Sequence, residues 1–241
     1  MKFHPSLRSY IRWFVLVEMV VLVLAFMVNS VIPLEVDELG SWGISNAGPS
    51  EAYRRSVIAQ GQAPLYFVLL SIWGSCFGWS PLALRSLSIC LLPATVAALL
   101  NMGTRLGWGV RVSALALLVV VSSPLWLTYT ILARPYALAV HLMAISLALW
   151  TSNLFKEGVR RYSAFALLGA LLFLTHYFFV VPFLLCIAFM DHYRREFRAG
   201  VHPLPMELLA GGAGVLFGLL LVVVPFSSHT GRLSDLNSLA P

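Results

Sequence analysis

The chain has 241 residues, of which 59% are hydrophobic and only 11% are charged. A soluble domain carries about 25% charged residues, so this composition excludes a water-soluble globular protein and favours an integral membrane protein. The net charge of +6 does not indicate a nucleic-acid partner, because the basic residues lie in short segments between apolar runs, where they encode membrane topology. The three cysteines lie inside apolar runs without metal-ligand spacing, so they predict no metal site.

Seven apolar runs are suited to membrane helices. The first follows Lys2, Arg8 and Arg12, and is too long for the apolar part of a signal peptide, so we expect an uncleaved helix. The polar triplet Thr175-His176-Tyr177 divides a later stretch into two short helices. The sequence therefore predicts an all-α, polytopic transmembrane bundle in a single domain over residues 1–241, with about seven membrane segments at 13–33, 82–101, 112–128, 136–155, 162–174, 175–190 and 207–226.

One further run, 64–77, is about 14 residues long, which is short for a membrane span. If it stays on the outer side, eleven basic residues fall inside and five outside. If it crosses the membrane, six fall inside and ten outside. Because basic residues concentrate in cytoplasmic loops, the sequence predicts a multi-pass protein of the cell inner membrane with a cytoplasmic N-terminus. Residues 34–81 then form one outer loop that contains juxtamembrane helices.

The outer loop contains acidic residues immediately after the first helix. Asp37 and Glu38 lie at the membrane boundary, where a carboxylate avoids most of the cost of a charge at the bilayer centre and can still meet a lipid-borne substrate. The simpler explanation, that these acids solvate a helix end, stays open. Further along the loop, Pro49-Ser50-Glu51 has the composition of a helix start.

Two later residues return to the same outer face. Arg134 lies in the turn between the third and fourth spans and can bind a phosphate through forked hydrogen bonds, or else reach toward lipid headgroups. His176 lies at the turn of the next hairpin and can donate to an anion or relay a proton, or else serve only in packing.

The order of these segments resembles the N-terminal half of a known family. Asp37-Glu38 is followed by an Ala-Pro-Leu-Tyr-Phe stretch at 63–67, and the match continues at Phe77-Gly78, 83–88, Ser123-Pro124, Tyr129, 133–138 and 175–177. The chain is similar here to family 39-type, PMT-like glycosyltransferases of the glycosyltransferase-C superfamily. Such enzymes are about twice as long, so we expect a truncated version of that scaffold.

The resemblance implies a membrane glycosyltransferase of the cell envelope. Its donor is a polyprenyl-phosphate-linked sugar, and its acceptor is a lipid, glycan or protein on the outer face of the membrane. The base that deprotonates the acceptor corresponds to Asp37, with Glu38 beside it. Arg134 and Arg85 correspond to residues that hold the donor phosphate, with Tyr136 and His176 as neighbours. The resemblance implies no definite cofactor, and a divalent cation stays open.

Two other functions stay open. A catalytically inactive or truncated membrane subunit is favoured by Leu132, because the family commonly has a glutamate two residues before the arginine. A double proline of the family is also replaced by Ala63-Pro64. A transporter or flippase is less well supported, because the spans lack the paired broken helices and midplane charges of such proteins.

Overall fold

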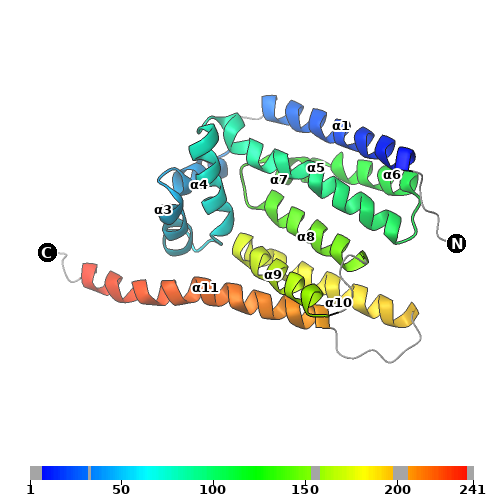
Figure 1. The fold of residues 1–241 in the computed structure, drawn as a ribbon. Coiled ribbons are helices and arrows are strands. Elements are labelled where there is room, and N and C mark those ends of the chain that lie inside the picture. The colour runs from blue at the N-terminus through cyan, green and yellow to red at the C-terminus, as the bar shows by residue number, and fades with distance from the viewer. Residues whose placement is uncertain (1–6, 32–33, 153–157, 198–205, 238–241) are drawn as a thin grey trace.

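The computed structural model describes residues 7–31, 34–152, 158–197 and 206–237, and within these ranges the chain is helical and contains no strand. The longer helices lie roughly side by side and alternate in direction along the chain (Figure 1). They are α1 (Leu7–Val31), α5 (Pro81–Arg105), α6 (Val110–Val121), α8 (Tyr136–Thr151), α9 (Val159–Thr175), α10 (Val180–Phe197) and α11 (Met206–Asn237), and the short α7 (Pro124–Ile131) follows α6.

Three short helices and a π-helical turn form a separate group, which we call the end cap. It consists of α2 (Val36–Ser45), α3 (Pro49–Arg54), the π-helix Arg55–Ala59 and α4 (Leu65–Phe77). Figure 1 shows these elements together at the end of the bundle where α1 finishes and α5 begins. The helix start expected at Pro49 is present, with Gly48 at a φ of 99° before it, a backbone conformation that favours glycine. The run at 64–77 is the 13-residue α4 of this cap.

Sequence and structure differ at the third expected span. Residues 112–128 were expected to form one helix, but the chain bends by 70° between α6 and α7. Ser123 caps α7, because its Oγ accepts a hydrogen bond from the Trp126 amide at 3.2 Å, and Pro124 occupies the first turn, where a missing N–H costs nothing. A serine cap followed by proline starts a new helix within an apolar run.

Among the described helices, α5 is long enough and apolar enough to cross a membrane. The bent pair of α6 and α7 would be a second such segment if the two form one span. Shorter apolar helical stretches are present at Leu65–Phe77, Tyr136–Thr151, Tyr177–Met190 and Leu208–Val223. The expected hairpin of 162–174 and 175–190 is present as α9 and α10, separated by a short 3-10 turn at Tyr177–Phe179.

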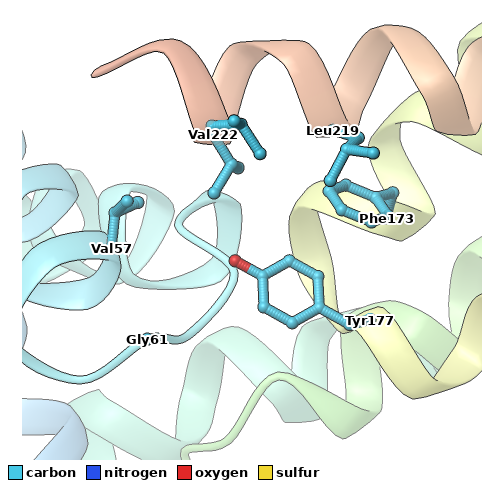
Figure 2. A pocket seen from close by; sticks show the side chains of 7 residues that line it. Val57, Gly61, Phe173, Tyr177, Leu219 and Val222 are labelled. Carbon is cyan, nitrogen blue, oxygen red and sulfur yellow. The ribbon is translucent and has the colours of Figure 1, made fainter. Parts of the chain in front are cut away.

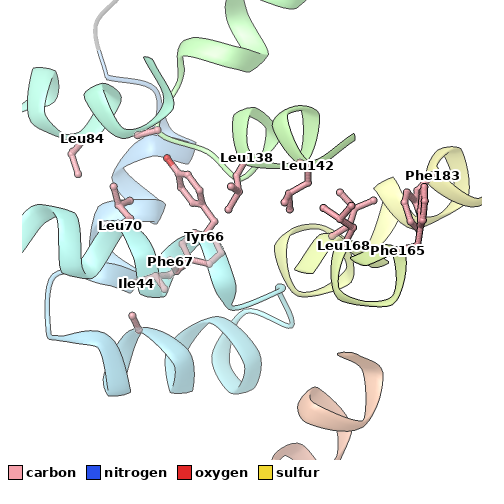
Figure 3. Close-up of a cluster of buried hydrophobic side chains, with 14 of the residues drawn as sticks. Ile44, Tyr66, Phe67, Leu70, Leu84, Leu138, Leu142, Phe165, Leu168 and Phe183 are labelled. Carbon is pink, nitrogen blue, oxygen red and sulfur yellow. The ribbon is translucent and has the colours of Figure 1, made fainter. Parts of the chain in front are cut away.

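The bundle is held together by two groups of buried apolar side chains. One lies between α1, α5 and α6 and includes Val17, Val21, Val96 and Leu100. The other connects the end cap to α8, α9 and α10, as Figure 3 shows for Tyr66 and Phe67 of α4 beside Leu138 of α8. This second core positions the end cap against the ends of the long helices.

The helices α9 and α11 pack through small residues. A Cβ added to Gly169 would clash with the Gly211 carbonyl oxygen, and one added to Gly214 would clash with that of Ala166. There is no room for a side chain at either position, so these glycines permit close approach of the two backbones.

The two ends of the bundle differ in charge. Away from the end cap lie several arginines near helix ends: Arg8, Arg12, Arg105, Arg111, Arg160 and Arg161. Arg161 is buried there and donates to the Trp150 and Ser152 carbonyl oxygens at 3.0 and 3.2 Å, which satisfies the C-terminus of α8. We call the end of the bundle that carries these six arginines the basic end. The end cap, in contrast, contains the acidic residues predicted to carry function.

Candidate functional site

The first turn of α2 places two neighbouring carboxylates in different environments. Glu35 caps this helix, and its backbone N–H donates to Glu38 Oε2 at 3.1 Å, which completes a capping box. With the helix start fixed in this way, the Asp37 side chain is 65% exposed and the Glu38 side chain is 0% exposed. Because adjacent residues of α2 point in different directions, Asp37 faces solvent and Glu38 faces the interior.

Glu38 forms a buried, bidentate ion pair with Arg85 of α5. Arg85 Nε donates to Oε1 at 2.8 Å, and Nη2 donates to Oε2 at 2.6 Å. The Ala133 amide, in the turn between α7 and α8, also donates to Oε1 at 2.9 Å. Burial alone would raise the pKa of Glu38, but the hydrogen bonds from Arg85, Ala133 and Glu35 lower it below its usual value, so the group is a carboxylate at neutral pH.

This pair changes two roles expected from the sequence. Glu38 was expected beside the catalytic base, and Arg85 was expected to bind the donor phosphate. Both side chains are buried and occupied by each other, with 2% of Arg85 exposed, so neither reaches a substrate in this conformation. We therefore assign both a positioning role: they join α2, α5 and the α7–α8 turn into one platform.

Asp37 and Arg134 meet at the surface of this platform. Arg134 Nη2 lies 3.4 Å from Asp37 Oδ2, and Nη1 donates to the Asp37 carbonyl oxygen at 3.2 Å. The Arg134 side chain is 13% exposed. Residues 97 apart in the sequence thus bring an exposed carboxylate and a guanidinium together, as the site predicted from the sequence requires.

Two aromatic groups extend the site from Arg134. Its guanidinium lies 5.7 Å from the centre of the Tyr136 ring, and that ring lies 5.1 Å from the ring of His176. Tyr129 packs against Tyr136 edge to face, with ring centres 5.1 Å apart. Asp37, Arg134, Tyr136 and His176, all predicted from the sequence, therefore form one continuous group of side chains.

Two polar atoms of this group are buried and have no hydrogen-bond partner among the described residues: Arg134 Nε and His176 Nδ1. Other buried polar atoms of the described chain also lack a partner, for example Ser45 Oγ and Trp126 Nε1, so such atoms do not by themselves indicate a ligand.

Sequence reasoning missed a polar chain beneath the platform. The Tyr66 hydroxyl lies 3.2 Å from Ser88 Oγ, which donates to the Leu132 carbonyl oxygen at 2.8 Å. Burial raises the pKa of Tyr66, so this hydroxyl stays protonated. These contacts fix the backbone just before Ala133 and Arg134. Nothing in the separate segments around Tyr66 and Ser88 indicates that they meet.

An apolar groove of about 370 Å³ opens near the site, beside Tyr177. Figure 2 shows Tyr177 between Phe173 of α9 and the loop at Gly61, with Val222 of α11 on another side. Val57, Leu219 and Val223 complete the lining. The groove is lined by the end cap, the C-terminal end of α9 with Tyr177, and α11. His176, which precedes Tyr177 in the chain, belongs to the polar site.

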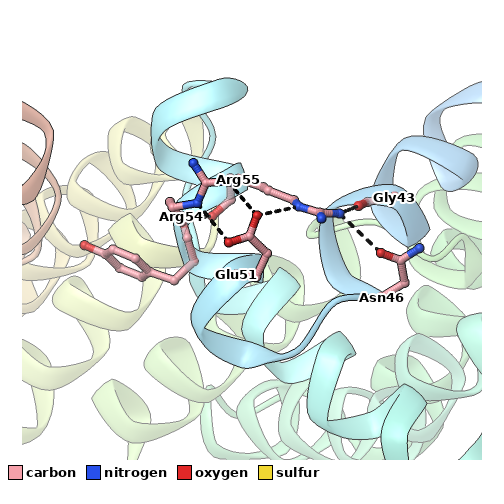
Figure 4. A network of polar contacts seen from close by, with 7 residues as sticks. Gly43, Asn46, Glu51, Arg54 and Arg55 are labelled. Carbon is pink, nitrogen blue, oxygen red and sulfur yellow. Dashed lines mark hydrogen bonds and ion pairs between the residues drawn. The ribbon is translucent and has the colours of Figure 1, made fainter. Parts of the chain in front are cut away.

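A surface network stabilises the end cap on another side (Figure 4). Glu51 accepts hydrogen bonds from Arg54 Nη2 at 2.6 Å and from Arg55 Nε at 2.9 Å, and these lower the pKa of Glu51 to about 2. Arg55 also donates to the Gly43 carbonyl oxygen at 2.6 Å, which connects the π-helix to α2. Glu51 thus compensates one of the two positive charges of Arg54 and Arg55.

No group of three or more His, Cys, Asp or Glu side chains suited to a metal ion occurs in the described part of the chain. Comparison with models of known families, with curated proteins and with solved structures gave no match. The functional argument therefore depends on the geometry of the site.

Proposed function

We propose that this chain is a membrane glycosyltransferase that moves a sugar from a polyprenyl-phosphate-linked donor to an acceptor hydroxyl on the outer face of the membrane. The observation that carries the proposal is the 3.4 Å contact between the exposed Asp37 carboxylate and Arg134. A base and a phosphate-binding cation are the two groups that this reaction needs close together.

The chemistry assigns one task to each residue. Asp37 accepts the proton of the acceptor hydroxyl as its oxygen attacks the anomeric carbon of the sugar. The bond between that carbon and the phosphate oxygen breaks, and the electron pair leaves with the polyprenyl phosphate. Arg134 stabilises the negative charge that develops on the departing phosphate. The proton on Asp37 then passes to water, which the exposed position of this side chain permits.

Arg134 Nη1 and Nη2 meet the exposed Asp37, and a guanidinium in this position can bind a phosphate through forked hydrogen bonds. We place the sugar of the donor beside the half-buried Tyr136, whose ring contacts Arg134. The apolar groove beside Tyr177 has the chemistry to take the first isoprene units of the donor. The polar and apolar parts of the lipid-linked sugar thus each have a matching surface.

The proposal includes the membrane arrangement. In it the long helices are seven membrane segments, the basic end faces the cytoplasm and the end cap faces outward. The positive-inside rule supports this orientation, because arginines gather at the end opposite the Asp37 site. The site then lies at headgroup depth, where a lipid-linked donor presents its sugar.

The test measures donor turnover by the purified full chain. Polyprenyl-phosphate hexoses and pentoses are supplied with a membrane-lipid extract as acceptor, and release of polyprenyl phosphate is followed. Arg134→Gln should reduce release by roughly a hundredfold or more, because it removes charge stabilisation from the leaving group. The matched control is Arg54→Gln, an exposed arginine of the same end that also pairs with a carboxylate; it should leave the rate unchanged.

Equal rates for wild type and Arg134→Gln would remove Arg134 from the reaction. Tight binding of polyprenyl phosphate by the wild-type chain, with no turnover of any donor, would instead favour the inactive membrane subunit.

A further inference from the structure

A hollow of about 830 Å³ lies at the basic end, far from the end cap along the bundle, between α1 and α6. Its lining contains three arginines. Arg8 and Arg12 are one helical turn apart on α1, and Arg111 enters from the first turn of α6. Two helices therefore direct cationic side chains toward one space.

The charge in this hollow is not compensated within the described part of the chain. No described acidic residue lines it, and no carboxylate described here pairs with Arg8, Arg12 or Arg111. The free N–H groups in the first turn of α6 add positive partial charge near Arg111. Three like charges around one space repel one another, so an anion bound between them lowers the energy of the arrangement.

The wall of the hollow changes character along α1. Leu16 is one turn beyond Arg12 on the same face and is 45% exposed, and Trp13 lines the space beside it. Arginines, then an indole, then an exposed aliphatic side chain match the order of a phospholipid from headgroup to acyl chain. A free anion would use only the polar part of this surface.

We infer that this hollow binds the headgroup phosphate of an anionic phospholipid, with an acyl chain along Leu16. Basic pockets between helices at the cytoplasmic side are suited to such headgroups. The site uses no residue of the proposed active site. It depends on the proposed membrane insertion and not on glycosyl transfer, so the two proposals fail separately.

The test uses the purified full chain in neutral detergent, where membrane orientation does not affect the result. Phosphatidylglycerol or phosphatidylcholine is titrated, and bound lipid is counted by native mass spectrometry. Phosphatidylglycerol should bind and phosphatidylcholine should not. Each arginine removed should weaken binding roughly fivefold, so Arg8→Gln, Arg12→Gln and Arg111→Gln together should weaken it roughly a hundredfold.

Arg160→Gln is the matched control, because it removes an exposed arginine of the same end that does not line the hollow; it should bind lipid as the wild type does. If the triple variant does not fold, Arg111→Gln alone should still show the fivefold loss. Equal weakening by Arg160→Gln would mean a diffuse charge effect and would overturn the site. Displacement of the lipid by inorganic phosphate at equal concentration would also overturn it, because the site would then bind a free anion.

Discussion

Asp37 and Glu38 are adjacent acidic residues with opposite environments. Glu38 is wholly buried and accepts hydrogen bonds from Arg85, Ala133 and Glu35, whereas Asp37 is mostly exposed and faces Arg134 at 3.4 Å. Both carboxylate oxygens of Glu38 accept hydrogen bonds from the protein, so they are not available to a substrate. The exposed pair is loose and accessible, as a site that exchanges a proton must be.

The comparison shows how one short helix separates support from chemistry. Glu38 binds the backbone of the α7–α8 turn at Ala133, and the next residue in that turn is Arg134. The buried pair therefore sets the position of the arginine that meets Asp37. The exposed pair therefore depends on the contacts beneath it for its position.

The largest expected effect is on stability. Glu38→Gln leaves the Arg85 guanidinium buried without its counter-charge, which costs about 3–5 kcal/mol of unfolding free energy in typical proteins. The measurement is unfolding of the detergent-solubilised chain with increasing sodium dodecyl sulfate. Asp37→Asn is the matched neighbour and should cost less than about 1 kcal/mol, because the Asp37 carboxylate is 65% exposed.

A double variant sharpens this prediction. Glu38→Leu with Arg85→Met removes both charges and should be considerably more stable than the sum of the two single changes predicts. A cost below about 1 kcal/mol for Glu38→Gln, or additive single changes, would contradict the role of the pair as the platform.

A smaller effect is expected from pH. The pKa of Glu38 is lower in the folded chain than its ordinary value of 4.5, so its contribution to stability is present above pH 4.5. As the pH falls below 4.5, the unfolded chain takes up this proton first, and the contribution is lost as the pH passes the lowered folded pKa. The unfolding free energy of the wild type should therefore decrease between pH 4.5 and the lowered pKa of Glu38. Glu38→Gln should not show the part of this decrease that is due to Glu38.

Glu51 is the necessary control for that experiment, because its pKa is also lowered, to about 2, by Arg54 and Arg55. The Glu51 network is at the surface, so high salt should screen most of its contribution to the pH-dependent loss of stability. The contribution of the buried Glu38 should remain. A fall in stability that salt abolishes completely would assign the effect to Glu51.

Much of the fold follows from local properties of the sequence. Apolar runs and their breaks predicted the helices around α1, α5, α8, α9, α10 and α11, because helix length depends mainly on nearby residues. The break at Ser123-Pro124 was missed, although serine before proline is a typical helix start, because it lies inside a mainly apolar run. The meeting of Asp37, Arg134 and His176 was predicted from topology, and that of Tyr136 with them from the family resemblance.

The different environments of Asp37 and Glu38 could not be predicted from the sequence. It depends on where α2 begins and which side of that helix faces α5, and both are set by packing between distant segments. Arg85 was placed in the substrate site by the family resemblance, and the sequence does not reveal that its guanidinium pairs with a buried glutamate.

The most direct test of the division between support and chemistry is the rate of sugar transfer by Asp37→Asn. The variant keeps the size of the side chain and loses its ability to accept a proton, so transfer should fall by at least about a hundredfold. Its unfolding free energy should stay within about 1 kcal/mol of wild type. Glu51→Gln, which removes another carboxylate of the end cap, should transfer sugar at the wild-type rate. Unchanged transfer by a folded Asp37→Asn protein would contradict the account.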